Sequence, residues 1–135
     1  VESAIRSRYQ GRRILLVDDE PVNLEVARSL LENTGLVVDT AEDGLDAIRR
    51  AGVTRYALIL MDVQMPRLDG LEATREIRGL PGYREVPIVA MTANAFAEGR
   101  ARCLDAGMND ILVKPFNPPR LFSVLMRYLD FSAGE

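Results

Sequence analysis

The sequence contains no histidine among its 135 residues. A His-based catalytic triad, a histidine-ligated zinc site and a phosphorylated histidine are therefore excluded within this chain. The single cysteine, Cys103, cannot form an internal disulfide, which favours a reducing cytoplasmic compartment. We interpret Cys103 as an ordinary helix position rather than a reactive thiol.

Lysine is almost absent as well. Lys114 is the only one, and the other 16 of the 17 basic residues are arginines. Lysine presents a compact point charge and arginine a wide planar fork, so the two differ in a tight site. A lone lysine can persist by chance, but its ammonium group is a candidate for binding an anion.

Long hydrophobic runs and an excess of positive charge are also lacking. No stretch of about 18 apolar residues occurs, so we expect no membrane contact by this domain. The net charge of −3 gives no electrostatic reason to expect nucleic-acid binding. The chain opens on Val1 rather than Met, which favours a piece of a longer protein, and residues 1–11 read as a linker or N-terminal extension.

Five short apolar runs alternate with five helical stretches from residue 12 onward. The runs are rich in Val, Ile and Leu, as strands buried on both faces of a parallel sheet are. They span 14–17, 36–40, 57–61, 87–91 and 110–113. The helical stretches end near Gly35, Gly52, Gly79 and Gly107, where a C′ glycine is expected. The pattern predicts an α/β fold with a doubly wound parallel sheet over residues 12–130, followed by a short tail, 131–135.

Charged or hydroxyl residues follow four of the five predicted strands. They are Asp18, Asp19 and Glu20 after the first, Asp62 after the third, Thr92 after the fourth and Lys114 after the fifth. Ligands of open α/β sheets bind at the carboxyl ends of the strands, so these residues are the candidate site. The end of the second strand, residues 41–44, reads as an ordinary turn.

Converging carboxylates repel one another unless a cation neutralises them. Mg²⁺ is typically held by one or two carboxylates, water and phosphate oxygens. A carboxylate can also act as a nucleophile and form an aspartyl-phosphate, whose formation needs neutralised phosphoryl oxygens. Asp62, Asp19, Thr92 and Lys114 suit these needs as nucleophile, metal ligand, hydroxyl donor and cation.

Each of these residues also has a purely structural interpretation. A single Asp at a strand end commonly caps a helix, and the Asp18–Asp19 pair could cap the first helix. Independent caps, however, have no reason to occupy four strand ends together with the only lysine. Their joint placement favours a functional site.

The sequence resembles the receiver domains of two-component response regulators from about Arg12 to Leu129. Four segments carry the resemblance: Leu15–Glu20 (LLVDDE), Met61–Pro66 with Asp69-Gly70 (MDVQMP, DG), Met91–Ala95 (MTANA) and Val113–Phe116 (VKPF). The resemblance implies a flavodoxin-like fold, with five strands in the order 2-1-3-4-5 and five helices on both faces.

The resemblance also implies roles for individual residues. Asp62 would be the phosphoacceptor, with Mg²⁺ (Mn²⁺ as a substitute) bound by Asp19, Asp62 and the backbone carbonyl of Gln64, and by Asp18 through water. Thr92 and Lys114 would contact the phosphoryl group. Such a domain catalyses its own phosphorylation and dephosphorylation, and a parent chain could add a histidine kinase.

One position departs from the family pattern. Ile111, three residues before the lysine, stands where receivers usually carry an aromatic residue that moves with the threonine. We therefore predict phosphorylation of Asp62 without the usual ring rotation. A large swing of another aromatic residue, such as Phe116, would contradict this prediction.

The phosphoryl group must come from another domain, because the chain has no histidine. The expected partners are a histidine kinase domain or a histidine phosphotransfer domain, and the surface from residue 95 onward is the expected output face, with a homodimer as one option. The motifs favour a receiver of a hybrid sensor histidine kinase, whose parent could be membrane-anchored. The alternative is a stand-alone single-domain regulator, since the segment after Leu129 is too short for a DNA-binding effector.

Two other functions compete with this interpretation. Phosphatases with an Asp nucleophile generally need a second Asp two residues later, where this chain has Gln64. A flavodoxin-like cofactor binder would need a phosphate loop rich in Ser, Thr or Gly after the first strand, where this chain has acids. No GxxxxGK[ST] or GxGxxG loop is present, which disfavours nucleotide binding.

Overall fold

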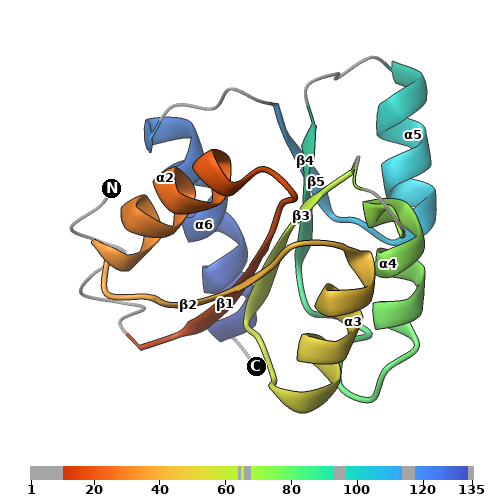
Figure 1. The fold of residues 1–135 in the computed structure, drawn as a ribbon, viewed down its shortest axis with the longest axis horizontal. Helices are drawn as coiled ribbons and strands as arrows, with labels where there is room; N and C mark the ends of the chain where they lie inside the picture. Colours follow the sequence, from red (N-terminus) through yellow and green to blue (C-terminus); the bar gives the residue numbers. More distant parts are fainter. Residues whose placement is uncertain (1–10, 64, 66–67, 93–96, 114–117, 134–135) are drawn as a thin grey trace.

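The structure is a computed structural model, and it describes residues 11–63, 65, 68–92, 97–113 and 118–133. Five strands alternate with five helices along these residues (Figure 1). The strands are β1 (Arg13–Val17), β2 (Val37–Ala41), β3 (Leu58–Asp62), β4 (Ile88–Thr92) and β5 (Asp110–Val113). The helices are α2 (Pro21–Glu32), α3 (Gly44–Val53), α4 (Gly70–Arg78), α5 (Ala97–Ala106) and α6 (Pro118–Ala133).

The strands form one parallel sheet in the order β2-β1-β3-β4-β5. This order confirms the predicted doubly wound topology. The switch in strand order lies between β1 and β3, which pair directly, with Val17 opposite Met61. In such sheets the crevice for a ligand opens beyond the carboxyl ends of the two strands at this switch.

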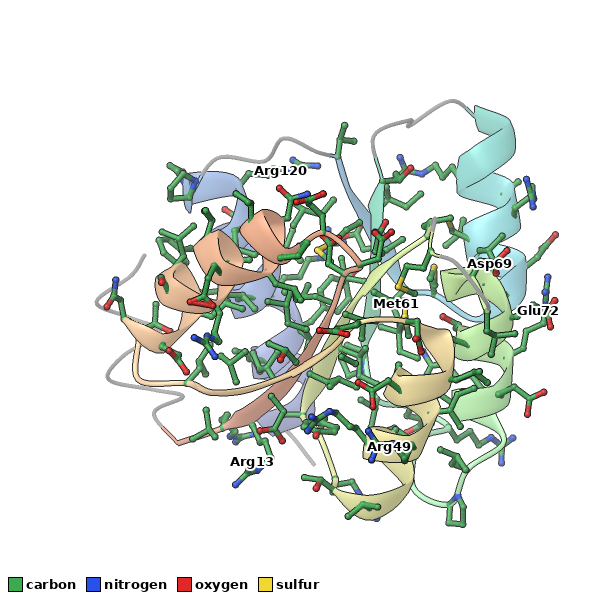
Figure 2. All side chains as sticks on the ribbon, viewed as in Figure 1. Arg13, Arg49, Met61, Asp69, Glu72 and Arg120 are labelled. Atoms are coloured by element: carbon green, nitrogen blue, oxygen red, sulfur yellow. The ribbon has the colours of Figure 1, made fainter. Side chains whose placement is uncertain are left out.

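The helices form two layers that cover opposite faces of the sheet. Helices α2 and α6 lie on one face, and α3, α4 and α5 lie on the other (Figure 1). Successive side chains of a strand point to opposite faces. Leu15 and Val17 therefore belong to the core on the α3–α4–α5 side, and Ile14 and Leu16 to the core on the α2–α6 side. The side chain of Met61, from β3, lies on the α4 side of the sheet (Figure 2).

Several predicted boundaries need correction by one residue or more. Strands β3 and β4 extend to Asp62 and Thr92, one residue beyond the apolar runs 57–61 and 87–91, so both residues lie at strand ends as predicted. Gly52 lies inside α3, and Gly79 caps α4 in a right-handed conformation; neither is a left-handed C′ glycine. Helix α6 runs to Ala133, so residues 131–133 are helical rather than part of a tail.

Gly35 and Gly107 do have the predicted left-handed conformation after their helices, with φ of 87° and 109°. Cys103 lies in α5 and is buried in the core on the α3–α4–α5 side, and burial raises the pKa of its thiol. This supports the interpretation of Cys103 as a packing residue. No helix among the described residues is both long enough and apolar enough to cross a bilayer.

Candidate functional site

Three carboxylates meet at the carboxyl edge of the sheet. Asp18, Asp19 and Asp62 each offer one oxygen, and these oxygens all lie within 4.8 Å of one another. Asp18 and Asp62 are buried, with 3% and 5% of their surface exposed, whereas Asp19 faces solvent. The structure therefore brings together the three acids that the sequence predicted for a metal site.

The first two acids are placed by the turn between β1 and α2. The backbone N–H of Asp18 donates to the carbonyl of Ala41 at 3.1 Å, which continues the pairing of β1 with β2 beyond Val17. The Asp18 carboxylate accepts from the backbone N–H of Glu20 at 2.9 Å. Pro21 then begins α2, where its missing N–H costs little.

The N-cap of α2 is Glu20, whose carboxylate accepts from the N–H of Val22. Neither Asp18 nor Asp19 is therefore the N-cap of α2, which was the structural alternative for this acidic pair. Both carboxylates remain at the sheet edge, beside Asp62.

Asp62 is held at its position by the central strand. It is the last residue of β3 and pairs with Met91 of β4, and the next residue, Val63, donates its N–H to the carbonyl of Met91 at 3.1 Å. Its own carbonyl is closely approached by Gly70: a Cβ atom on that glycine would lie 2.2 Å from the Asp62 oxygen. The backbone that carries the carboxylate is thus fixed on two sides.

Thr92 ends the neighbouring strand at the same edge. It is partly exposed and pairs with Val113, the last residue of β5. Lys114, Gln64 and Asn94 lie outside the described residues, and so does Phe116. Of the predicted site residues, the structure thus describes Asp18, Asp19, Asp62 and Thr92.

The donor chemistry of the three acids fits a hard divalent cation. Carboxylate oxygens are the ligands that Mg²⁺ uses in proteins, and three like charges this close are unfavourable without a counterion. Asp18, Asp19 and Asp62 could therefore hold one cation between them. With such a cation bound, the cluster suits phosphoryl chemistry, whereas the three carboxylates by themselves would repel the phosphate of a flavin.

Two neighbours of this site, Gly44 and Leu68, were not predicted from the sequence. Residues 41–44 resemble an ordinary turn, yet Gly44 donates its N–H to the carbonyl of Leu68 at 3.1 Å. Leu68 follows Asp62 by six residues and directly precedes the Asp69-Gly70 pair. That pair is recognisable in the sequence, but no residue pattern indicates that Gly44 contacts the residue before it.

Fold and site together are those of a doubly wound α/β domain with an acidic cluster at the switch point of its sheet. The sequence matches the response regulator receiver domain family over residues 14–126, so the chain belongs to that family. The match confirms the resemblance on which the sequence interpretation was built.

Two curated relatives illustrate the settings of such domains. The chain is 42% identical over 115 residues, 85% of its length, to the signal transduction histidine-protein kinase BarA of Shigella flexneri. It is also 42% identical over 120 residues, 89% of its length, to the transcription factor SKN7 of Saccharomyces cerevisiae. These matches cover 12% of BarA and 19% of SKN7, so the chain corresponds to a small part of either protein.

Among solved structures, the chain resembles the receiver domain of the sensor histidine kinase PA1611 from Pseudomonas aeruginosa PAO1. The TM-score is 0.84 at 48% identity, and the match covers 89% of this chain and 98% of that one. The PA1611 domain holds a magnesium ion in its active-site cleft.

Proposed function

We propose that this receiver domain accepts a phosphoryl group on Asp62 from a phosphohistidine of a partner, with Mg²⁺ as cofactor. The observation that carries the proposal is the convergence of Asp18, Asp19 and Asp62 within 4.8 Å at the carboxyl edge of the sheet. The magnesium ion in the PA1611 receiver supports it.

In the transfer, a carboxylate oxygen of Asp62 attacks the phosphorus atom. The new O–P bond forms as the P–N bond breaks, and the electron pair of that bond stays on the histidine nitrogen, which takes a proton from solvent. Asp62 is suited to this role because it ends a buried strand, so its carboxylate is held in place at the mouth of the crevice.

The other residues neutralise and orient charge. Asp19, Asp62 and the Gln64 carbonyl would hold Mg²⁺ directly, and Asp18 would hold it through water; the ion supplies positive charge to the phosphoryl oxygens. Thr92 would donate its hydroxyl to one of these oxygens. The Lys114 ammonium would pair with another, which gives the only lysine of the chain its function.

We infer the wider setting from the relatives. BarA and PA1611 are both histidine kinases, so we favour a receiver within a hybrid sensor histidine kinase, with residues 12–130 as the domain and residues 1–11 as a linker. The partner would then be a histidine kinase or histidine phosphotransfer domain in the cytoplasm. The match to the transcription factor SKN7 keeps receivers in other settings, including stand-alone regulators, as the alternative.

The proposal is tested by incubating the domain with acetyl phosphate and Mg²⁺ and measuring its intact mass. We expect the wild type to gain one phosphoryl group and Asp62→Asn to gain none. Asp69→Asn is the matched control: Asp69 caps α4 through the N–H of Glu72 at 3.0 Å, and Asn caps equally well, so labelling should persist. Labelling that survives in Asp62→Asn would refute the proposed phosphoacceptor.

A further inference from the structure

Two glycine N–H groups bond to described residues of the segment between β3 and α4. Gly70 donates to the carbonyl of Val63, at the start of this segment, at 3.0 Å. Gly44, at the start of α3, donates to the carbonyl of Leu68, near its C-terminal end, at 3.1 Å. Asp69, the next residue, lies at the start of α4 (Figure 2). Val63 is thus bonded to the start of α4, and Leu68 to the start of α3.

The contact at Gly44 leaves no room for a side chain. A Cβ atom on Gly44 would lie 2.3 Å from the carbonyl oxygen of Leu68 and 2.9 Å from its carbonyl carbon. Both atoms belong to the backbone, so no flexible side chain could move aside. Gly52, in the same helix, has nothing within 4 Å of such an atom. Space, not backbone conformation, makes glycine necessary at position 44.

The contact also satisfies a group that the helix cannot satisfy itself. Gly44 is the first residue of α3, and the first N–H groups of a helix have no partner within it. The side chain of the N-cap residue, Asp43, accepts from the N–H of Asp46 at 2.8 Å. The carbonyl of Leu68 accepts the Gly44 N–H, and the buried side chains of Ala47 and Ala51 pack α3 against the sheet. Leu68 is therefore bonded to a helix whose own position is set by packing in the core.

We propose that Gly44 is a positioning residue for the metal site, acting through the carbonyl of Leu68 and, two residues further on, through Gly70 on the backbone of Asp62. The inference rests on the proposed function, in which Asp62 is a ligand of Mg²⁺. Gly70 lies directly against the Asp62 carbonyl, and the bond from Gly44 sets the position of Leu68, two residues before Gly70. Loss of a group that hydrogen-bonds directly to a metal ligand typically weakens metal binding about 10- to 100-fold, and Gly44, one contact further away, should lie at the lower end of that range.

The test compares Gly44→Ala with Gly52→Ala, the same substitution at an unobstructed position of the same helix. Isothermal titration with Mg²⁺ should show a dissociation constant about tenfold higher in Gly44→Ala and unchanged in Gly52→Ala. Circular dichroism and urea unfolding show whether each variant is folded. A folded Gly44→Ala protein that binds Mg²⁺ within twofold of the wild type would overturn the proposal.

A second measurement needs no variant. In the wild type, the amide resonance of Gly44 should shift when Mg²⁺ is added, together with those of Leu68 and Asp62, while that of Gly52 should stay in place. Movement at Asp62 without movement at Gly44 would refute the coupling and leave the metal site intact. A wild-type protein that binds no Mg²⁺ would instead refute the proposed function, and this inference with it.

Discussion

The hydroxyl of Tyr56 donates a 2.7 Å hydrogen bond to a carboxylate oxygen of Asp39. Tyr56 lies two residues before β3 and Asp39 lies in β2, so the bond links strands that are separated by β1. The same oxygen of Asp39 also pairs with Arg13 of β1 at 3.3 Å. These contacts join the three strands near the amino-terminal ends of β1 and β3, whereas the acidic site lies at the carboxyl ends.

The Tyr56–Asp39 bond predicts a specific loss of stability at alkaline pH. Burial and the hydrogen bond to Asp39 raise the pKa of Tyr56 to about 12, from an ordinary value of 10.0. The fold therefore favours the protonated hydroxyl, and this stabilisation is complete below pH 10 and is lost as the pH rises to about 12. The loss approaches about 1.4 kcal/mol per pH unit over that window.

The measurement is urea unfolding between pH 7 and pH 12 for the wild type and Tyr56→Phe. The variant should be less stable at pH 7 by about 1–3 kcal/mol, because it loses a hydrogen bond to a charged acceptor. Its stability should then fall less steeply between pH 10 and pH 12. Equal slopes for the two proteins would show that Tyr56 does not govern this pH range.

The acidic site predicts a response to metal removal. In the wild type, Mg²⁺ at about 100 times its dissociation constant should stabilise the fold by about 2.7 kcal/mol, and EDTA should reverse this. Asp19→Asn should respond far less to Mg²⁺. Without metal it should be more stable than the wild type, because one of three converging charges is removed.

Differential scanning calorimetry with and without Mg²⁺ measures both effects. Glu42→Gln is the control, since Glu42 is an exposed acid after β2 that does not belong to the cluster. It should keep the full response to Mg²⁺. An undiminished response in Asp19→Asn would remove Asp19 from the metal site.

The contacts of Arg78, far from the acidic site, indicate that this side chain contributes strongly to the stability of the fold. Its guanidinium donates to the carbonyls of Gly107, Tyr83 and Val86 at 2.6–3.0 Å, and to the side chain of Asn109 at 2.8 Å. It makes no ion pair with a carboxylate among the described residues. Arg78 thus joins the end of α4 to the loops before β4 and β5.

Arg78→Ala should lower the free energy of unfolding by about 2–4 kcal/mol, because several carbonyls lose their donor at once. Arg78→Lys should recover little of this, since an ammonium group cannot span the same acceptors. Arg75→Ala, one turn away on α4, removes only an exposed ion pair with Glu72 and should cost under about 1 kcal/mol. Comparable losses in urea unfolding for Arg78→Ala and Arg75→Ala would contradict this reading.

The aliphatic residue at position 111 leads us to expect that phosphorylation proceeds without the rotation of an aromatic ring at this position. Its side chain is buried in the core on the α3–α4–α5 side, in the same cluster as Cys103 and Met108. A buried aliphatic side chain has no ring to rotate between a buried and an exposed position. We expect the methyl resonances of Ile111 to keep their buried environment after phosphorylation of Asp62, while that of Thr92 shifts. Exposure of Ile111 on phosphorylation would contradict this expectation.

The sequence by itself determined the class of fold and the position of the acids. Buried parallel strands need continuous apolar runs, and the helices between them need apolar residues at helical spacing, so both patterns are local and readable. The candidate site was readable for the same reason. Residues that directly end or follow parallel strands must meet at one edge of the sheet, and Asp18, Asp19 and Asp62 do so.

Only the tertiary structure decided which distant backbones touch. The fit of Gly44 against Leu68, the set of carbonyls around Arg78 and the bond from Tyr56 to Asp39 join segments that carry no mutual signal in the sequence. Such contacts depend on how helices and loops pack to within fractions of an ångström, because van der Waals repulsion rises steeply at short range. A pattern of residue types specifies which surface is buried, but it does not specify the atoms that meet there.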